Sequence, residues 1–308
     1  MKIKKIWTLF LLLCFLVACT DNPVTTEPVD LPTNPTDTNT TEVILSSTPT
    51  EVITPTPDEP MIALVNGEGI RLQDFEDEYL RYESAANFLN KDIDLDKAKE
   101  IVLNNMIDTL LLAQGARDNG YGLTQESFDN RIQQLISDSG GEDQFQDWLT
   151  QNHYSQESFQ RLFRLELEAT WMRDKIISEV PTREEQIRAR QILVSSRTLA
   201  DDIFNQLENG ADFDYYSWGY DQLSGGELGW FPRDYLVLSQ IEDAVFNLQP
   251  GEYSEVIESA YGYHIVQVME HELDRQLTQD ALIQKQKKAI SEWLVSQKAN
   301  GSVSIVQD

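Results

Sequence analysis

The sequence contains few cysteines, histidines and basic residues, and each shortage excludes a class of function. Only two Cys and three His occur in 308 residues. Both cysteines, Cys14 and Cys19, lie near the start, which excludes a disulfide scaffold, a cysteine-rich metal site and a cysteine nucleophile in the folded part. The 24 Lys and Arg stand against 52 Asp and Glu, a net charge of −28. Nucleic acid is therefore not an expected partner, because phosphate binding needs a cationic surface.

The chain has enough apolar residues to form hydrophobic cores, and it is long enough for more than one domain. Hydrophobic residues make up 41% of the sequence, so the chain is not disordered throughout. Its length is typical of two domains rather than one.

Residues 1–18 have the features of a signal peptide. Three lysines among the first five residues precede an almost wholly apolar run from Ile6 to Ala18, which is shorter than the ~20 residues that a membrane-spanning helix needs. The run ends in Leu16-Val17-Ala18-Cys19, which resembles the bacterial lipobox. The resemblance implies cleavage before Cys19, acylation of that cysteine, and an extracytoplasmic protein that is lipid-anchored to a bacterial membrane. A plain secretory signal and an uncleaved anchor are the alternatives.

Residues 19–60 are expected to be a disordered tether. From residue 20 onward this stretch holds twelve Thr, eight Pro and eight Asp or Glu, and no Lys or Arg. Such a composition cannot bury enough apolar surface to offset its chain entropy. A flexible chain of this length spans about 35 Å, and we expect it to hold the folded part away from the lipid surface.

Residues 61–182 are predicted to form a helical domain with a short β-hairpin at its start. Asn66-Gly67 separates two short apolar strands and is typical of a type I′ turn. Apolar residues at helical spacing follow from Leu103 to Leu111, and again after the predicted N-caps Thr124 and Ser155.

Residues 183–272 show a different periodicity and predict a compact α+β domain. A strand at residues 191–194, a helix at 199–207, a glycine-rich extended segment, a helix at 241–248 and a final strand at 264–268 follow one another. Residues 273–308 contain one more amphipathic helix, which is too isolated to be stable alone and is expected to dock on the helical domain.

Six segments in this order resemble a parvulin-type peptidyl-prolyl isomerase domain. They are Arg190-Gln191-Ile192-Leu193-Val194, Asn209-Gly210-Ala211-Asp212-Phe213, Gly225-Gly226-Glu227-Leu228-Gly229-Trp230-Phe231, Glu242-Asp243-Ala244-Val245-Phe246, Pro250-Gly251-Glu252 and Tyr261-Gly262-Tyr263-His264-Ile265. The flanking segments, from Val65-Asn66-Gly67-Glu68 to Ile177-Ser178-Glu179-Val180, resemble the chaperone region of SurA/PrsA-type extracytoplasmic foldases. The implied fold class is α+β: a helical SurA-like chaperone domain that includes the C-terminal helix, and a parvulin-like β-α-β-β domain, behind the tether.

The resemblance implies a set of site residues. His264 matches the second active-site histidine of the family, and Asp221 is the best match to its Asp/Cys position, although a solvated loop aspartate is an equal alternative. The proline socket would be lined by five apolar residues: Leu228, Phe231, Leu236, Ile241 and Phe246. Ordinary core is the preferred alternative for Leu228 and Phe246, and an equal alternative for the other three. The reaction implies no cofactor and no metal.

The chain departs from the parvulin pattern at one catalytic position. Gln191 stands where the family carries its first histidine, and a glutamine can donate and accept hydrogen bonds but cannot hold a proton near neutral pH. Two functions follow from this. The first is a membrane-anchored foldase that isomerises X-Pro bonds in proline-containing, newly exported polypeptides and also acts as a chaperone. The second is a holdase whose degenerate parvulin domain only binds peptides.

Overall fold

The structure is a computed structural model that describes residues 59–92 and 94–306. The predicted signal peptide, the lipid-attachment residue Cys19 and the tether up to residue 58 lie outside the described residues. Within the described ranges, no helix is both long enough and apolar enough to cross a membrane.

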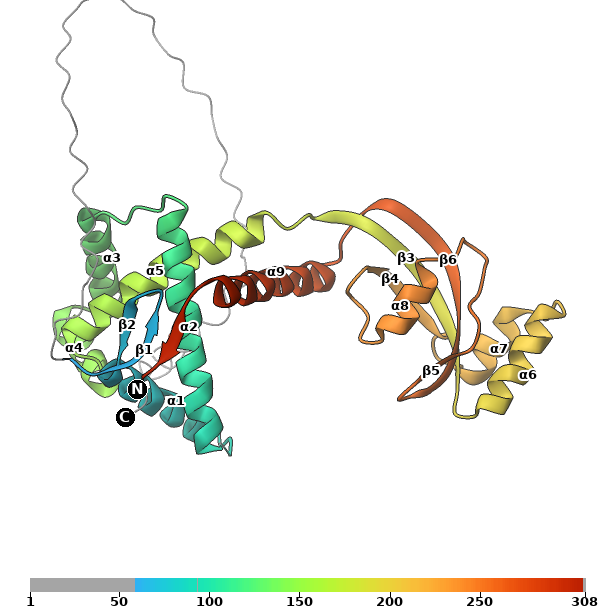
Figure 1. Ribbon diagram of the computed structural model, residues 1–308, viewed down its shortest axis with the longest axis horizontal. Helices are drawn as coiled ribbons and strands as arrows, with labels where there is room; N and C mark the ends of the chain where they lie inside the picture. Colours follow the sequence, from blue (N-terminus) through green and yellow to red (C-terminus); the bar gives the residue numbers. More distant parts are fainter. Residues whose placement is uncertain (1–58, 93, 307–308) are drawn as a thin grey trace, which may run out of the picture. The chain divides into compact units, whose positions relative to one another are not determined.

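Five consecutive helices follow the first two strands, and a second, antiparallel sheet follows them, which confirms the predicted α+β class (Figure 1). The elements in chain order are β1 (Met61–Val65), β2 (Glu68–Arg71), α1 (Leu72–Phe88), α2 (Leu95–Asp118), α3 (Gln125–Asp138), α4 (Glu142–Gln151), α5 (Gln156–Ser178), β3 (Arg183–Val194), α6 (Arg197–Glu208), α7 (Phe213–Tyr220), β4 (Glu227–Pro232), α8 (Ser239–Val245), β5 (Ile257–Ser259), β6 (Gly262–Gln276), α9 (Gln279–Asn300) and β7 (Val303–Ile305).

The first sheet is antiparallel, with strand order β2-β1-β7. Asn66 and Gly67 link β1 to β2 with φ values of 53° and 87°, so both have the positive φ of the predicted type I′ turn. Ala63 and Val65 on β1 are fully buried and pack against Ile107 and other residues of α2. The third strand, β7, comes from the end of the chain and was not predicted.

The predicted helix starts after residue 123 are confirmed. The Thr124 hydroxyl accepts a hydrogen bond from the Ser127 N–H at the start of α3. Ser155 and Ser158 form a reciprocal capping box at the start of α5. Each cap satisfies backbone donors that the first turn of a helix leaves without a partner. Behind the caps, α3, α4 and α5 share a core of aromatic and aliphatic side chains.

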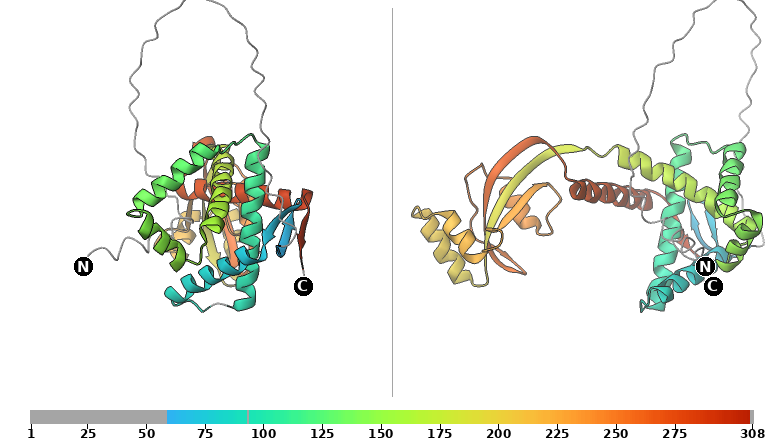
Figure 2. Two further views of the ribbon diagram at one scale, coloured as in Figure 1. Left: turned by 90° about the vertical axis from the view of Figure 1, so that its left-hand side faces the viewer. Right: turned by 180° about the vertical axis from the view of Figure 1, so that it is seen from behind.

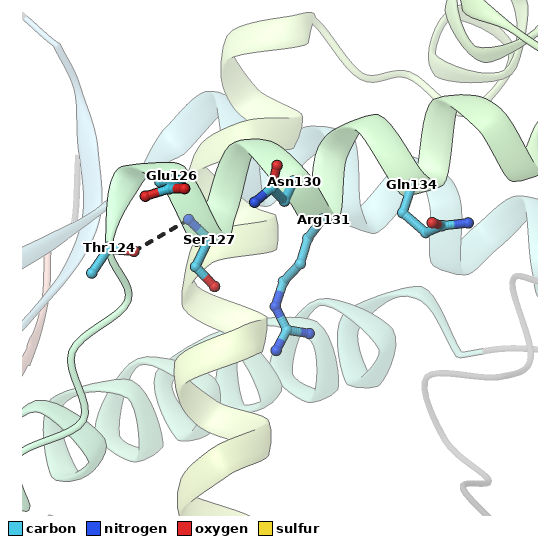
Figure 3. A pocket seen from close by; sticks show the side chains of 6 residues that line it. All are labelled: Thr124, Glu126, Ser127, Asn130, Arg131 and Gln134. Carbon is cyan, nitrogen blue, oxygen red and sulfur yellow. Dashed lines mark hydrogen bonds between the residues drawn. The ribbon is translucent and has the colours of Figure 1, made fainter.

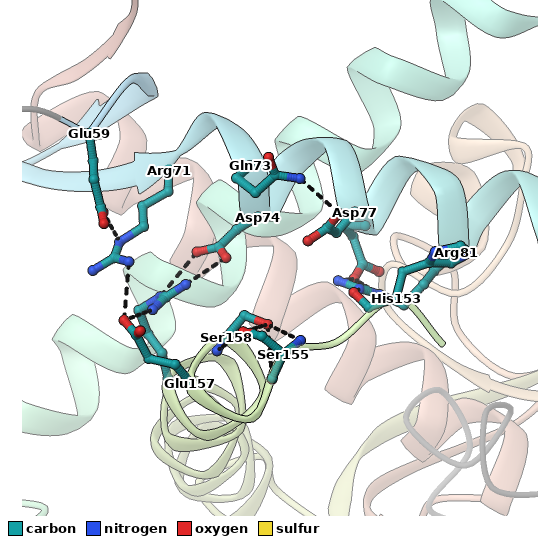
Figure 4. A network of polar contacts seen from close by, with 12 residues as sticks. Glu59, Arg71, Gln73, Asp74, Asp77, Arg81, His153, Ser155, Glu157 and Ser158 are labelled. Atoms are coloured by element: carbon teal, nitrogen blue, oxygen red, sulfur yellow. Dashed lines mark hydrogen bonds and ion pairs between the residues drawn. The ribbon is translucent and has the colours of Figure 1, made fainter. Parts of the chain in front are cut away.

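A network of polar contacts fixes α1 to the start of α5 (Figure 4). The buried Asp74 carboxylate of α1 accepts two hydrogen bonds from the Arg161 guanidinium of α5, at 2.7 and 3.1 Å. Further along α1, Arg81 donates to the backbone carbonyls of Asn152 and His153. These charges are paired inside the protein, which offsets the cost of removing them from water.

The C-terminal helix α9 packs on the helices that precede the second sheet (Figures 1 and 2). Trp293 and Leu294 of α9 contact the apolar residues of α2. Gly115 of α2 makes this approach possible, because a Cβ at that position would lie 2.6 Å from the Trp293 ring.

The second sheet has strand order β4-β3-β6-β5, with every pairing antiparallel. One face carries a core built with α8, in which Ile187 of β3 and Val268 of β6 are fully buried. The other face carries a core built with α6, around Ile192 and Ile265.

Several elements of this sheet differ from their predicted extents. The strands β3 and β6 are longer than predicted. Strand β3 begins at Arg183 rather than at residue 191, and β6 extends to Gln276 rather than ending at residue 268. Helix α8 ends at Val245, three residues before the predicted end. Helix α7 was not predicted.

Candidate functional site

The register of β3 and β6 brings Gln191 and His264 together. Leu193 lies opposite His264, and Gln191 lies opposite Val266. Since residues two apart on a strand share a face, Gln191 and His264 are diagonal neighbours on one face of the sheet. The Gln191 Oε1 atom lies 2.7 Å from His264 Nδ1.

Ser259 completes a hydrogen-bonded chain through the imidazole. The tight hairpin between β5 and β6 pairs Ser259 with Gly262, which places the Ser259 Oγ atom 2.6 Å from His264 Nε2. The same Oγ accepts the Tyr261 N–H at 3.0 Å, so the hydroxyl proton is free to point at the imidazole. We therefore assign the tautomer in which Nε2 accepts from Ser259 and Nδ1–H donates to Gln191.

The imidazole is buried, and its burial favours the neutral form. His264 is 2% exposed, and burial lowers its pKa below the ordinary 6.5. Both ring nitrogens have their partners inside the protein. The contacts of the imidazole therefore lead outward only through Ser259 and Gln191, which are half-buried.

Asp221 lies in a turn beside this chain of hydrogen bonds. Its carboxylate accepts from the backbone N–H groups of Leu223, Ser224 and Gly226 and from the Ser224 hydroxyl. The hydrogen bonds from Ser224 hold the pKa of Asp221 below its usual range. The hydrogen bonds of the Asp221 carboxylate do not include Gln191 or His264.

Asp221 reaches Gln191 through Gly226. The Gly226 carbonyl accepts the Gln191 N–H at 2.8 Å. Gly226 has a φ of +72°, and a Cβ there would lie 1.9 Å from the Gln191 carbonyl oxygen. Only glycine fits this approach. The turn that Asp221 organises therefore fixes the backbone of Gln191.

The five apolar residues expected to form the socket divide into two groups. Phe231, Ile241 and Phe246 are buried in the core under the same sheet face as His264, with at most 8% exposed. Leu228 and Leu236 are half-buried and pack against that core. Only the last two present appreciable surface to a ligand.

Sequence reasoning missed two residues of this region, Ser259 and Glu242. The buried Glu242 carboxylate accepts from the backbone N–H groups of residues 234–236 and so holds the loop that carries Leu236. A Ser at the position before a two-residue hairpin turn could have identified Ser259, because the turn fixes its register against His264. No sequence signal identified Glu242.

A separate hollow of about 530 Å³ lies along α3 (Figure 3). Its lining residues belong to that helix and its N-cap: Thr124, Glu126, Ser127, Asn130, Arg131 and Gln134. It includes none of the predicted site residues. Within residues 59–92 and 94–306, no group of three or more His, Cys, Asp or Glu side chains is placed to hold a metal ion.

Two family models match the chain in succession. The SurA-like N-terminal domain matches residues 45–173, and the PPIC-type PPIASE domain matches residues 175–272. The second range contains Gln191, Asp221, Ser259 and His264. The domain that holds the site is therefore a peptidyl-prolyl isomerase domain, whose partner is a polypeptide.

Relatives that match the chain are named foldases. The chain is 29% identical over 232 residues to the foldase protein PrsA of Caldanaerobacter subterraneus subsp. tengcongensis, covering 67% of this chain and 72% of that relative. It is 28% identical over 190 residues to PrsA of Geobacillus kaustophilus, covering 58% of this chain and 64% of that relative, so the match to this relative spans less than two thirds of it. The crystal structure of the peptidylprolyl isomerase PrsA from Bacillus anthracis is 24% identical, with a TM-score of 0.40, covering 67% of this chain and 99% of that one. The chain therefore carries a SurA-like N-terminal domain followed by a PPIC-type peptidyl-prolyl isomerase domain, and it is similar to foldases named PrsA.

Proposed function

We propose that this foldase isomerises X-Pro bonds of newly exported polypeptides at the surface formed by Gln191, Ser259, Leu228 and Leu236. Rotation about the bond must cross a barrier of about 18–20 kcal/mol, which arises because resonance keeps the peptide planar. The trans form is favoured over the cis form by only about 0.5–1 kcal/mol. The reaction therefore needs neither a nucleophile nor a metal, but a site that favours the twisted bond over the planar one.

A dry apolar surface supplies that preference. The planar imide is the more polar form, because resonance separates charge between its oxygen and nitrogen, and water stabilises that separation. Side chains such as Leu228 and Leu236 exclude water from the bond and so favour the twisted form. Phe231, Ile241 and Phe246 support these two leucines from beneath.

The observation that carries this proposal is the linear series of hydrogen bonds from Gln191 through His264 to Ser259. Every member is neutral, so the mechanism moves no proton. The chain fixes the orientation of the Gln191 amide and the Ser259 hydroxyl, the two polar groups that can contact the peptide. Asp221 fixes the backbone of Gln191 from the other side. We assign substrate contact to Gln191 and Ser259, and positioning to His264 and Asp221.

We further propose the division of labour along the chain. Residues 1–18 are removed as a signal peptide, the acylated Cys19 inserts into a bacterial membrane, and residues 19–60 hold the protein away from it. Residues 61–182, with the C-terminal segment 273–308, hold unfolded clients, while residues 183–272 isomerise them. A net charge of −28 makes nucleic acid an unfavourable partner.

The alternative function, a holdase with a catalytically silent parvulin domain, is favoured by one observation. His264 is 2% exposed and Gln191 stands where the family carries a histidine, so no imidazole of the site can contact the substrate. In that function the same surface binds proline-containing segments without accelerating their rotation.

Refolding of a client whose slow step is X-Pro isomerisation separates the two functions. With the full chain added, we expect the slow phase to accelerate, and His264→Ala to remove the acceleration while suppression of client aggregation persists. His153→Asn, an exchange of an exposed residue outside residues 183–272, serves as the control. No acceleration by the unmodified chain, together with suppressed aggregation, would establish the holdase. Intact mass of Cys19 peptides from membranes tests the acylation.

A further inference from the structure

An aromatic surface outside the catalytic chain of hydrogen bonds lies on α7 and the turn after it. Four large side chains are more exposed than a soluble surface requires: Tyr215 at 74%, Trp218 at 51%, Tyr220 at 47% and Leu223 at 96%. We call these four residues the α7 surface. Large apolar and aromatic side chains that are exposed together in one short segment are candidates for an interaction site, and Tyr and Trp are among the residues that carry the most binding energy at interfaces.

The α7 surface is continuous with the candidate site. The Trp218 ring packs against Gly225, where a Cβ would lie 2.7 Å from the indole. The next residue, Gly226, is bonded to the backbone of Gln191. A polypeptide whose proline lies at Gln191 can therefore extend directly onto the α7 surface.

The charge around the α7 surface is strongly negative. Residues 208–227 contain five Asp or Glu and no Lys or Arg. Among the described residues, the guanidinium groups paired with them come from β3: Arg190 binds Asp214, and Arg188 lies 3.7 Å from Glu227 but closer to Glu270 of β6, at 3.2 Å. Both arginines are largely buried by their neighbours, at 16% and 30% side-chain exposure. Two arginines against five carboxylates leave three negative charges without a positive partner in the part of the chain that the structure describes.

Negative charge and aromatic faces select the same class of ligand. The face of a Trp or Tyr ring carries negative electrostatic potential and attracts a cation within about 6 Å of its centre. The nearby carboxylates repel acidic segments and attract basic ones. The stem of a Lys or Arg side chain is also apolar and can lie on an exposed leucine such as Leu223.

We infer that the α7 surface is a docking site for a Lys- or Arg-bearing segment of the client next to the proline that is isomerised. This inference rests on the proposed function and names its substrate class: prolines with a basic, partly apolar flank. One cation–π contact at an exposed site corresponds to a preference of roughly fivefold.

The test uses peptides that contain one X-Pro bond and one Arg, placed two to five residues from the proline on either side. Each peptide is matched by one in which citrulline replaces Arg, which keeps the size and removes the charge, and by one with Glu. Binding to the full chain is measured by fluorescence anisotropy of the labelled peptide. The rate of isomerisation is measured on the same peptides by exchange NMR.

We expect at least one Arg position to bind about fivefold more tightly than its citrulline match, and the Glu peptide to bind more weakly than both. Tyr215→Ala and Trp218→Leu should each reduce the ratio of Arg-peptide affinity to citrulline-peptide affinity. Leucine keeps an apolar side chain beside Gly225 and removes the aromatic face. Phe88→Ala, at a phenylalanine of α1 that is 71% exposed, should leave the preference intact.

The outcomes separate this inference from the proposed function. Isomerisation without an Arg preference at any position overturns the inference and leaves the function standing. An Arg preference that the two α7 variants abolish, without isomerisation of any peptide, supports the docking surface and overturns the catalytic function. An Arg preference that survives both variants places basic recognition elsewhere and overturns the inference.

Discussion

At the scale of single residues, the site depends on a histidine that must stay uncharged. The Nδ1–H and Nε2 atoms of His264 have different roles toward Gln191 and Ser259, and a second ring proton would leave Ser259 facing a donor. A glutamine at position 191 suits a neutral imidazole, because its amide oxygen accepts from Nδ1–H without carrying charge.

This neutrality predicts how stability depends on pH. Burial lowers the pKa of His264 in the folded state, so on acidification the unfolded chain takes up this proton first. The contribution of His264 is therefore complete above about pH 6.5, the ordinary histidine value, and is lost as the pH falls toward the lowered pKa. Urea unfolding of the full chain and of His264→Asn should show a free-energy difference that shrinks from pH 8 to pH 5. A difference that is constant over this range contradicts the assignment.

A second prediction concerns the two glycines on either side of Leu228. Gly226 and Gly229 have similar positive φ values, +72° and +74°, but a Cβ at Gly226 collides with the Gln191 carbonyl, whereas nothing lies within 4 Å of one at Gly229. Gly229→Ala should cost about 1–2 kcal/mol from its left-handed backbone alone. Gly226→Ala should cost clearly more and should also lower isomerase activity, because it displaces Gln191.

Thermal unfolding and activity of the two variants measure this difference. Equal losses of stability and of activity in Gly226→Ala and Gly229→Ala would show that the close approach of Gly226 to Gln191 contributes to neither.

Part of the site could be predicted from residues alone. His264 and Val266 alternate on a strand, so their shared face follows from the pattern. Ser259 and Glu242 were missed because their roles depend on a hairpin register and on the path of a loop. The burial of Phe231 and Ile241 was left open, since an apolar residue in a glycine-rich segment is compatible with either a core or a socket.

At the scale of elements, regular periodicity decided what was predictable. The hairpin at Asn66-Gly67, the caps at Thr124 and Ser155 and the stripe on α2 all follow local rules, and the structure confirms them. Helix α7 has the sequence Phe-Asp-Tyr-Tyr-Ser-Trp-Gly-Tyr, in which the buried face combines Phe213 with the polar Ser217, so no apolar stripe stands out among the other aromatic residues. The apolar stripe that normally identifies a helix is therefore absent. We attribute the exposed aromatic rings of α7 to binding rather than to folding.

The contact between α9 and α2 gives a prediction that contrasts two helical glycines. A Cβ at Gly115 would lie 2.6 Å from the Trp293 ring, whereas nothing lies within 4 Å of a Cβ at Gly219 of α7. Alanine raises helix propensity by about 1 kcal/mol at either position. Gly219→Ala should therefore stabilise the protein, whereas Gly115→Ala should destabilise it, because the packed indole must move.

Differential scanning calorimetry of both variants gives the signs. Stabilisation by Gly115→Ala would show that Trp293 is not held against α2.

At the scale of the whole molecule, one chain combines a SurA-like N-terminal domain with a PPIC-type isomerase domain, and the chemistry lies in the second. The sequence segments that resemble these two domains predicted the combination from the sequence alone. Segments at glycine-rich turns and strand ends can be identified in this way because few residues can adopt the backbone geometry required there. The third strand of the first sheet could not be predicted, since β7 pairs with residues more than two hundred positions away.

The central claim is that a neutral, proton-free site accelerates rotation about X-Pro bonds. Exchange NMR of an X-Pro peptide at equilibrium, with catalytic amounts of the full chain, measures this most directly. The account predicts accelerated cis–trans exchange that is constant between pH 7 and pH 9, and that is lost in Gln191→Ala and in Ser259→Ala. Exchange at the uncatalysed rate, or acceleration that both variants retain in full, would contradict it.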